Sequence, residues 1–330
     1  MAVELLLIII ALAFIFDFLN GMNDSANSVA TIVATRVLKP RNAVILAAFM
    51  NFAAAFVFTT AVASTFGKGL VDPQALNQTT ILAALISAII WTYAATVRGL
   101  PISVSHAITG GLIGAAVATA GFSVVIFEGV FKTLVFIFIA PLLGLGGAIT
   151  LSVIIIRLFR KSPPGKINNY FKKLQIVSAS FYSLGHGSND AQKTMGIIYA
   201  ALIISGSLTP ADHVPSWVIM SAYTAIALGT LFGGWRVVKT MGMRLTKLRP
   251  FEGFSAEGAS GSVLLFTALA GIPVSTTHTI TGAITGVGIV KRISAVRWIV
   301  VNRIIWSWIL TIPVTAMAAA GIYFLLSLII

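Results

Sequence analysis

Apolar stretches long enough to cross a lipid bilayer recur from one end of the chain to the other. A transmembrane helix needs about 20 mostly apolar residues, and only 9% of the residues in this chain are charged. Soluble domains carry about 25% charged residues, and no such domain fits between the stretches. The sequence therefore predicts an all-α polytopic membrane protein. The expected spans are 3–35, 43–63, 81–98, 101–120, 129–157, 175–204, 216–235, 257–272, 274–290 and 299–326.

The basic residues lie beside these spans. Of the 22 lysines and arginines, 19 fall in five groups, and all five face the cytoplasm if the spans alternate from an external N-terminus. Because cytoplasmic loops are enriched in Lys and Arg, we expect a multi-pass protein of the plasma membrane with both termini external. The net charge of +13 then requires no nucleic-acid partner. The first residues lack the basic region of a signal peptide, so the N-terminus is expected to be retained. The five groups are 36–41, Arg98, 157–173, 236–249 and 291–303.

Two motifs occur once in each half of the chain. The pair Asn23-Asp24 recurs as Asn189-Asp190, and the segment 99–110 (GLPISVSHAITG) is echoed by 271–282 (GIPVSTTHTITG). The chain therefore reads as a duplication, and an odd number of spans in each half predicts two repeats of inverted topology. Inverted repeats in secondary transporters bind substrate and ions near the midplane, on broken or re-entrant helices, and we expect the same here. The predicted units are a first repeat over 1–156, a basic cytoplasmic linker over 157–174 and a second repeat over 175–330.

The repeated Asn-Asp pairs place carboxylates at membrane depth. As one helix, the first span would be about 50 Å long, against about 30 Å of hydrocarbon, so we expect it to break near Gly21. A carboxylate in the membrane is costly and is normally kept where it pairs, binds an ion or lines water. Asp24 and Asp190 are therefore predicted to bind a cation or a proton. The alternative is that each only caps the start of a half-helix.

The second pair of motifs has the chemistry of an anion site. Each segment places a proline near the start of a helix, followed by hydroxyl groups, and a helix N-terminus in a membrane cavity favours phosphate or carboxylate. The alternative is that these hydroxyls bond to their own helix. The candidate hydroxyls are Ser103, Ser105, Thr109, Ser275, Thr277 and Thr281.

Four further residues are candidates with a competing structural role. His106 and His278 can donate to an anion or carry a proton, or serve as structural hydrogen-bonding groups. Lys193 lies deep inside a predicted span, away from its ends, which suggests an ion partner for an aspartate or a counter-charge for an anion. Glu257 begins a span and is a candidate for cation binding or gating, or else a carboxylate at the cytoplasmic surface.

The repeated motifs resemble those of a known family. Residues 21–28 (GMNDSANS) and 186–193 (HGSNDAQK) are similar to the paired signatures of the inorganic phosphate transporter (PiT) family, and the two proline-serine blocks resemble its second repeated pair. The resemblance covers nearly the whole chain. It implies a secondary active transporter that imports inorganic phosphate by cation symport, commonly as a homodimer. The short linker, and Asn51 where eukaryotic members have Glu, point to a prokaryotic form.

The resemblance also implies roles for the candidates. Coupling sodium ions would bind at Asp24 and Asp190 with Asn23 and Asn189, and we add Glu257 as a further coupling-ion candidate. The hydroxyl blocks would hold phosphate, and we add Asn27, Lys193, His106 and His278 to that site. No cofactor is expected besides the coupling ions. We take alternating access as the mechanism.

Several alternatives remain open. Sodium is favoured as the coupling ion, but some bacterial members use protons and take metal-phosphate complexes, and a relative of the same fold could carry sulfate. A passive anion channel would need a continuous pore. A distant alternative is an intramembrane hydrolase built on Ser103 or Ser275 with a nearby histidine, which would leave the duplicated Asn-Asp pairs unexplained. Because the chain has no cysteine, disulfides and thiol catalysis are excluded. We therefore expect a transporter and not an enzyme.

Overall fold

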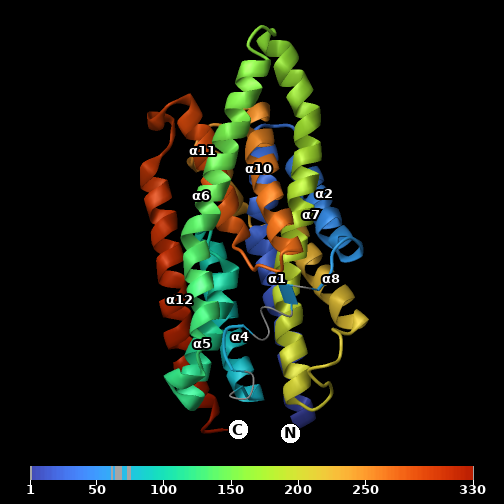
Figure 1. Ribbon diagram of the computed structural model, residues 1–330, viewed down its shortest axis with the longest axis vertical. Helices are drawn as coiled ribbons and strands as arrows, with labels where there is room; N and C mark the ends of the chain where they lie inside the picture. The colour runs from blue at the N-terminus through green and yellow to red at the C-terminus, as the bar shows by residue number, and fades with distance from the viewer. Residues whose placement is uncertain (1, 61, 64–68, 73–75, 330) are drawn as a thin grey trace.

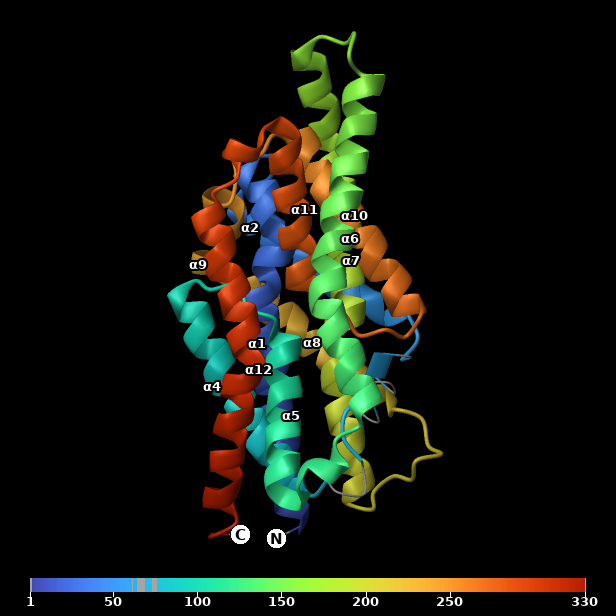
Figure 2. The same ribbon diagram turned by 60° about the vertical axis from the view of Figure 1, so that its left-hand side comes forward.

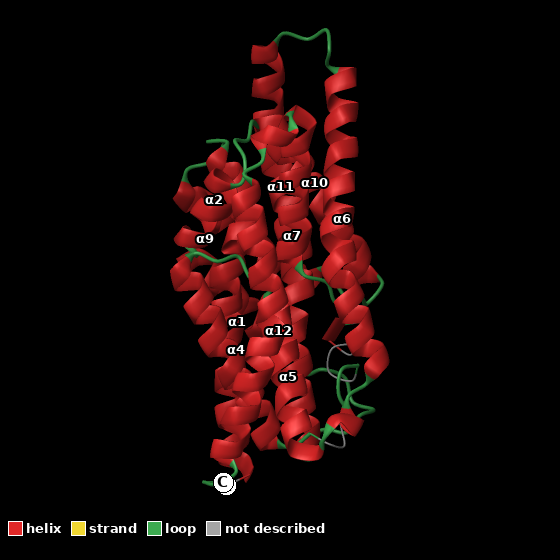
Figure 3. Cartoon of the chain, turned by 90° about the vertical axis from the view of Figure 1, so that its left-hand side faces the viewer, coloured by secondary structure: helices red, strands yellow, loops and turns green. Residues whose placement is uncertain are grey.

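The computed structural model describes residues 2–60, 62–63, 69–72 and 76–329, and almost all of these are helical. Figure 3 shows helices joined by short loops and no strand in the part of the chain that is described. The predicted all-α class is confirmed, and each of the ten expected spans coincides with a helix, apart from the part of span 43–63 that lies outside the described residues. The helices are α1 (Ala2–Ala34), α2 (Pro40–Ala53), α4 (Gln78–Arg98), α5 (Val104–Ala120), α6 (Phe127–Leu158), α7 (Pro164–Ile204), α8 (Ser216–Phe232), α9 (Trp235–Lys239), α10 (Pro250–Leu269), α11 (Thr276–Lys291) and α12 (Trp298–Leu326), with short η helices at Ala54–Phe56, Phe122–Val124, Thr240–Arg244 and Ile293–Ala295.

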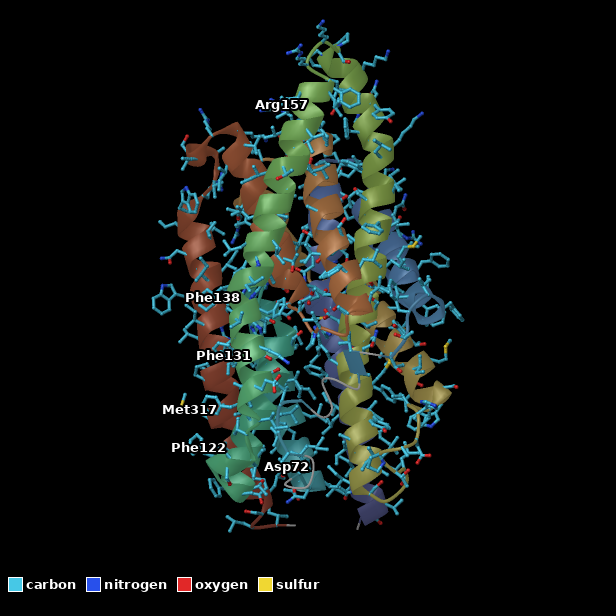
Figure 4. All side chains as sticks on the ribbon, viewed as in Figure 1. Asp72, Phe122, Phe131, Phe138, Arg157 and Met317 are labelled. Carbon is cyan, nitrogen blue, oxygen red and sulfur yellow. The ribbon has the colours of Figure 1, made fainter. Side chains whose placement is uncertain are left out.

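The longest helices run along the molecule. Both termini lie at one end, and the connection between α6 and α7 lies at the other (Figure 1). Within the described residues, four single helices, α1, α4, α6 and α12, are long and apolar enough to cross a membrane, and α8 with the segment from Trp235 to Arg244 forms a possible fifth span, bent by 62°. Large apolar side chains such as Phe131 and Phe138 point outward and are exposed, as expected of a surface that faces lipid (Figure 4).

Two pairs of helices form hairpins. The pairs α4–α5 and α10–α11 reverse direction in the central part of the molecule and open toward opposite ends (Figure 2). The expected spans 81–98, 101–120, 257–272 and 274–290 therefore form two hairpins and not four separate membrane crossings. This corrects the sequence prediction. Hydropathy reports whether a segment is apolar and does not report where the chain turns. If each hairpin enters and leaves on one side, each half still has an odd number of crossings, so the predicted inversion does not depend on this difference.

Helices of the two halves pack in matched pairs. Helix α5 packs on α12 and α11 packs on α6, while α8 packs on α1 and α2 packs on α7. Matched glycines allow α5 to lie close to α12, and α11 to lie close to α6. A Cβ at Gly114 would lie 2.1 Å from the carbonyl oxygen of Ala316, and one at Gly286 would lie 2.6 Å from that of Leu145. Small residues allow helix backbones to approach in this way inside membranes.

The expected break near Gly21 is wrong. Helix α1 continues without interruption through the first Asn-Asp pair, and α7 continues through the second. Gly21 serves close packing instead, because a Cβ there would lie 2.1 Å from the carbonyl oxygen of Ile226. Gly187 has the same role against Asn51, because a Cβ at Gly187 would lie 2.6 Å from the backbone carbonyl oxygen of Asn51. The side chains of Asn23, Asp24 and Asn27 form hydrogen bonds to neighbouring helices, so the backbone does not need to open to accommodate them.

Candidate functional site

The two aspartates of the repeated Asn-Asp pairs meet at one hydroxyl group. Asp24 on α1 and Asp190 on α7 are both buried. Thr276 Oγ, at the first residue of α11, lies 3.1 Å from Asp24 Oδ2 and 3.1 Å from Asp190 Oδ2. A hydroxyl has one proton and can donate to only one of these oxygens. The other contact therefore brings two oxygen atoms together without a proton between them. Two carboxylates in this position also need positive charge from other groups.

A histidine faces the same two carboxylates. His186 Nε2 lies 3.1 Å from Asp190 Oδ2 and 3.8 Å from Asp24 Oδ2. One ligand atom from each of the three residues lies within 4.8 Å of the others, so the group can hold a metal ion. His186 precedes Asp190 by one helical turn and shares its helix face, which is the signal by which the sequence could have assigned it to the site.

The neighbours of His186 determine which ring nitrogen carries a proton. The Thr230 hydroxyl donates to the carbonyl oxygen of Ile226 (2.9 Å) and accepts from Asn51 Nδ2 (2.9 Å). The oxygen of the Asn51 amide must then face His186 Nδ1, at 3.1 Å, so Nδ1 donates. Nε2 is left to the two carboxylates, either protonated, giving an imidazolium, or with a cation between them.

Lys193 supplies one positive charge and joins α7 to both hairpins. Its ammonium group donates to Asp190 Oδ1 at 2.6 Å, to Ser105 Oγ at 2.5 Å and to the carbonyl oxygen of Val274 at 2.9 Å. All three of its donors are therefore used. The ammonium compensates one of the two carboxylates and leaves the other to be balanced.

Asn27 and Thr277 complete the site on the α1 side. Thr277 Oγ donates to Asp24 Oδ1 at 3.2 Å and accepts from Asn27 Nδ2 at 2.9 Å. Both residues were predicted from the sequence, and both lie beside the carboxylates. Thr276 was not predicted, because three hydroxyl residues follow one another at 275–277 and the sequence does not indicate which of them faces α1 and α7.

The predicted serines of the two blocks cap helices. Ser103 Oγ accepts from the His106 backbone N–H and Ser275 Oγ from that of His278, each at 3.3 Å. Helices α5 and α11 therefore begin three residues after their prolines, with their N-termini in the centre of the molecule. The rings of the two histidines meet edge to face with centroids 4.8 Å apart, and His278 also packs on Trp308. The tips of the two hairpins thus touch each other.

A small cavity lies between these tips. Ser105, His106, Thr109 and Ser275 contribute to its wall, and its volume is about 20 Å³. Such a space holds about one water molecule and is too small for phosphate. Thr281 is separated from this group, because it lines an apolar cavity between α6, α11 and α12.

The asparagines of the repeated pairs have matching arrangements. Asn23 Nδ2 donates to Thr96 Oγ on α4 at 2.7 Å, and Asn189 Nδ2 donates to the carbonyl oxygen of Leu264 on α10 at 2.9 Å. Both Oδ1 atoms are buried and have no hydrogen-bond partner among the described residues. Each Asn-Asp pair thus contains one buried amide oxygen that has no partner among the described residues.

Glu257 forms a separate group. Its carboxylate is buried and accepts from Thr31 Oγ at 2.5 Å, Gln175 Nε2 at 3.0 Å and Ser178 Oγ at 2.5 Å. The alternative of a cytoplasmic-surface carboxylate is therefore wrong. Three neutral donors surround the charge, and no cation pairs with it in the described part of the chain. Gln175 and Ser178 were missed because nothing near them in the sequence marks them as polar ligands.

The chain matches a known protein family over most of its length. The sequence model of the Phosphate transporter family matches the chain twice, over residues 20–166 and over residues 159–319. The chain belongs to the phosphate transporter family. It is 51% identical over 325 residues to a probable low-affinity inorganic phosphate transporter of Rhizobium meliloti, covering 98% of this chain and 97% of that protein. A protein of the same description from Bacillus subtilis is 42% identical, with 98% of each chain covered.

A solved structure also resembles this member of the phosphate transporter family. It is described as the sodium-dependent phosphate transporter, and it superposes with a TM-score of 0.85 at 26% identity over 99% of this chain and 100% of that one. The resemblance stated from the motifs is thereby confirmed. The names of the family and its members confirm a multi-pass membrane transporter, not an enzyme.

Proposed function

We propose that this member of the phosphate transporter family imports inorganic phosphate together with cations, with sodium favoured, by alternating access. The observation that carries the proposal is the pair of buried carboxylates that share the single proton of Thr276, with one ammonium group to balance them. A cation supplies the missing charge. The sodium dependence named for the similar solved structure supports the choice of sodium.

Charge balance explains why ion and substrate would bind together. Phosphate adds at least one more negative charge near Ser105 and Thr277, beside carboxylates that are already undercompensated. Bound cations remove this repulsion, so each ligand raises the affinity for the other by the same factor. The predicted coupling-ion residues Asp24 and Asp190 lie at this position, with Asn23 and Asn189 next to them in the chain, and Glu257 offers a separate one.

The small volume of the central cavity supports alternating access. A space of about 20 Å³ between the hairpin tips must widen for phosphate to enter or leave. Thr276, Thr277 and Lys193 tie the tips to α1 and α7, so opening toward either end requires these hydrogen bonds to exchange. Ions and phosphate that bind at the same atoms would compete with these hydrogen bonds, and their binding would therefore control the opening.

We further propose that the chain is two inverted repeats with external termini and a cytoplasmic linker. The matched helix contacts, the matched glycines and the two successive matches of the family model support the repeats. The basic linker lies at the end opposite both termini, in agreement with the positive-inside rule (Figure 1). Location in the plasma membrane and association as a homodimer remain predictions.

The test is uptake of radiolabelled phosphate into liposomes that contain the purified protein. An inward sodium gradient is compared with an inward proton gradient at equal membrane potential. Uptake driven by sodium and competed by unlabelled phosphate supports the proposal. Uptake driven only by protons contradicts sodium coupling, and competition by sulfate rather than phosphate contradicts the substrate.

A second candidate is transport of phosphate with a divalent metal. His186 Nε2 beside two carboxylates favours it, because imidazole is a ligand for transition metals and not a typical one for sodium. Phosphate uptake with manganese or zinc, compared in unmodified protein and in His186→Gln, separates the two. Metal-stimulated uptake that the substitution leaves unchanged would reject this candidate.

A further inference from the structure

A second buried carboxylate of α1 lies outside the site described above. Asp17 is completely buried, and neither of its carboxylate oxygens has a hydrogen-bond partner among the described residues. A buried charge is normally paired, hydrogen-bonded or bound to an ion. Asp17 forms no ion pair and no hydrogen bond of ordinary length among the described residues, although the buried carboxylates Asp24, Asp190 and Glu257 all accept hydrogen bonds.

The surroundings of Asp17 offer oxygen atoms. Thr194 on α7 and Asn20, one turn further along α1, are the polar side chains that act on its carboxyl group at close range. Thr194 Oγ and Asn20 Oδ1 are themselves buried and have no partner in the described part of the chain. Two carboxylate oxygens, one hydroxyl oxygen and one amide oxygen are therefore left unsatisfied in the same region.

No basic side chain lies close enough to pair with Asp17 within the described residues. The ionisable groups that act on it are His186 and Asp190 from α7 and Tyr223 from α8. His186 already faces Asp190 and Asp24, and its other nitrogen is taken by Asn51. The charge of Asp17 is thus left without a partner from the protein.

Asp17 is also absent from the repeated pattern. The position equivalent to it in the second half, at the same separation as Asp24 and Asp190, is Ser183, whose hydroxyl donates to the carbonyl oxygen of Ala179 in its own helix. The duplication therefore does not require a carboxylate here. A carboxylate present in one half alone points to a task that the central site does not share.

We propose that Asp17, Asn20 Oδ1 and Thr194 Oγ bind a sodium ion, separate from the cations at Asp24 and Asp190. Hard cations prefer oxygen ligands, and this group supplies a carboxylate, an amide and a hydroxyl. The proposal rests on the proposed cation-coupled transport. Asp17 precedes Asp24 by seven residues, or about 10 Å of helix, toward the end that holds both termini (Figure 1). A cation that enters from that end meets Asp17 before the central site.

The first experiment counts sodium ions without transport. Radiolabelled sodium is bound to the purified, phosphate-free protein by equilibrium dialysis, and unmodified protein is compared with Asp17→Asn. We expect the variant to bind one sodium ion fewer per chain. Equal binding by the two proteins overturns the proposal. Because this assay needs no uptake, it separates failure of this site from failure of the proposed function.

The second experiment uses a milder change with a matched control. Thr194→Val removes one proposed ligand, and Thr92→Val removes a buried, equally unpartnered hydroxyl on α4. Even outer-shell changes at metal sites weaken binding by about 10-fold to 100-fold. We expect Thr194→Val to raise the sodium concentration for half-maximal binding by about tenfold or more, and Thr92→Val to leave it unchanged. Equal effects of the two substitutions would show a general packing role and reject the site.

Discussion

Replacing Asp24 by Asn removes one negative charge from the central site with almost no change of shape. The Asn side chain keeps an oxygen that can accept from Thr276 or Thr277, so the loss is mainly electrostatic. A cation bound by the Asp24 carboxylate lies within about 4 Å of its charge, because oxygen ligands lie about 2.3–2.6 Å from hard cations. A unit charge at about 4 Å contributes about 4 kcal/mol at an effective dielectric constant of about 20. At about 1.4 kcal/mol per tenfold change, sodium affinity should fall about a thousandfold.

The assay is phosphate uptake into liposomes over a range of external sodium concentrations. Asp24→Asn should show no saturable sodium stimulation, while Asp212→Asn, in the connection between α7 and α8, should match unmodified protein. Phosphate binding in sodium-free buffer should change in the opposite direction and strengthen, because the substitution removes charge repulsion. Normal folding is checked by gel filtration and thermal melting. An unchanged sodium dependence, or weaker sodium-free phosphate binding, would refute the charge-balance argument.

Three further predictions follow from the same contacts. Lys193→Met should raise the KM for phosphate, since it leaves Asp190 uncompensated beside the anion, and an unchanged KM in uptake kinetics would contradict this. Glu257→Gln should weaken the sodium dependence of uptake more than the affinity for phosphate, because this carboxylate lies in a separate group and is surrounded by neutral donors. Titrating uptake with sodium and with phosphate compares the two effects, and a larger change in phosphate affinity would contradict the prediction. Gly282→Ala should lower the melting temperature, because its Cβ would lie 2.1 Å from a backbone oxygen of α6, with overpacking worth about 1–3 kcal/mol, whereas Gly146→Ala has open space and should not.

The sequence motifs identified much of the central site. Asp24, Asp190, Asn27, Thr277 and Lys193 were all chosen from two repeated patterns, and the structure brings them together. Charged and polar side chains in apolar spans are few, and the membrane makes each of them costly unless it has a partner. That physical constraint is why a short pattern could identify residues that are more than 250 positions apart.

Other parts of the site could not be predicted. His186 shares a helix face with Asp190, but nothing in the local spacing shows that it also faces Asp24, or that Thr276 faces both aspartates. Thr281 has the same residue type and block as Thr277, but it lies against α6 and α12. The face that a hydroxyl presents depends on how the hairpin is rotated, and rotation is set by packing.

The amino-acid sequence by itself determined the membrane class, the approximate positions of the helices, the duplicated motifs and the carboxylates that enter the bilayer. These follow from hydropathy and from the cost of burying charge, and both are properties of short segments. The tertiary structure alone decided that α1 and α7 stay unbroken, that the two hairpins turn in the centre, and that Asp17 is left without a partner. Each of these depends on which helix backbones approach closely, and that is decided by glycine contacts and side-chain packing between distant parts of the chain.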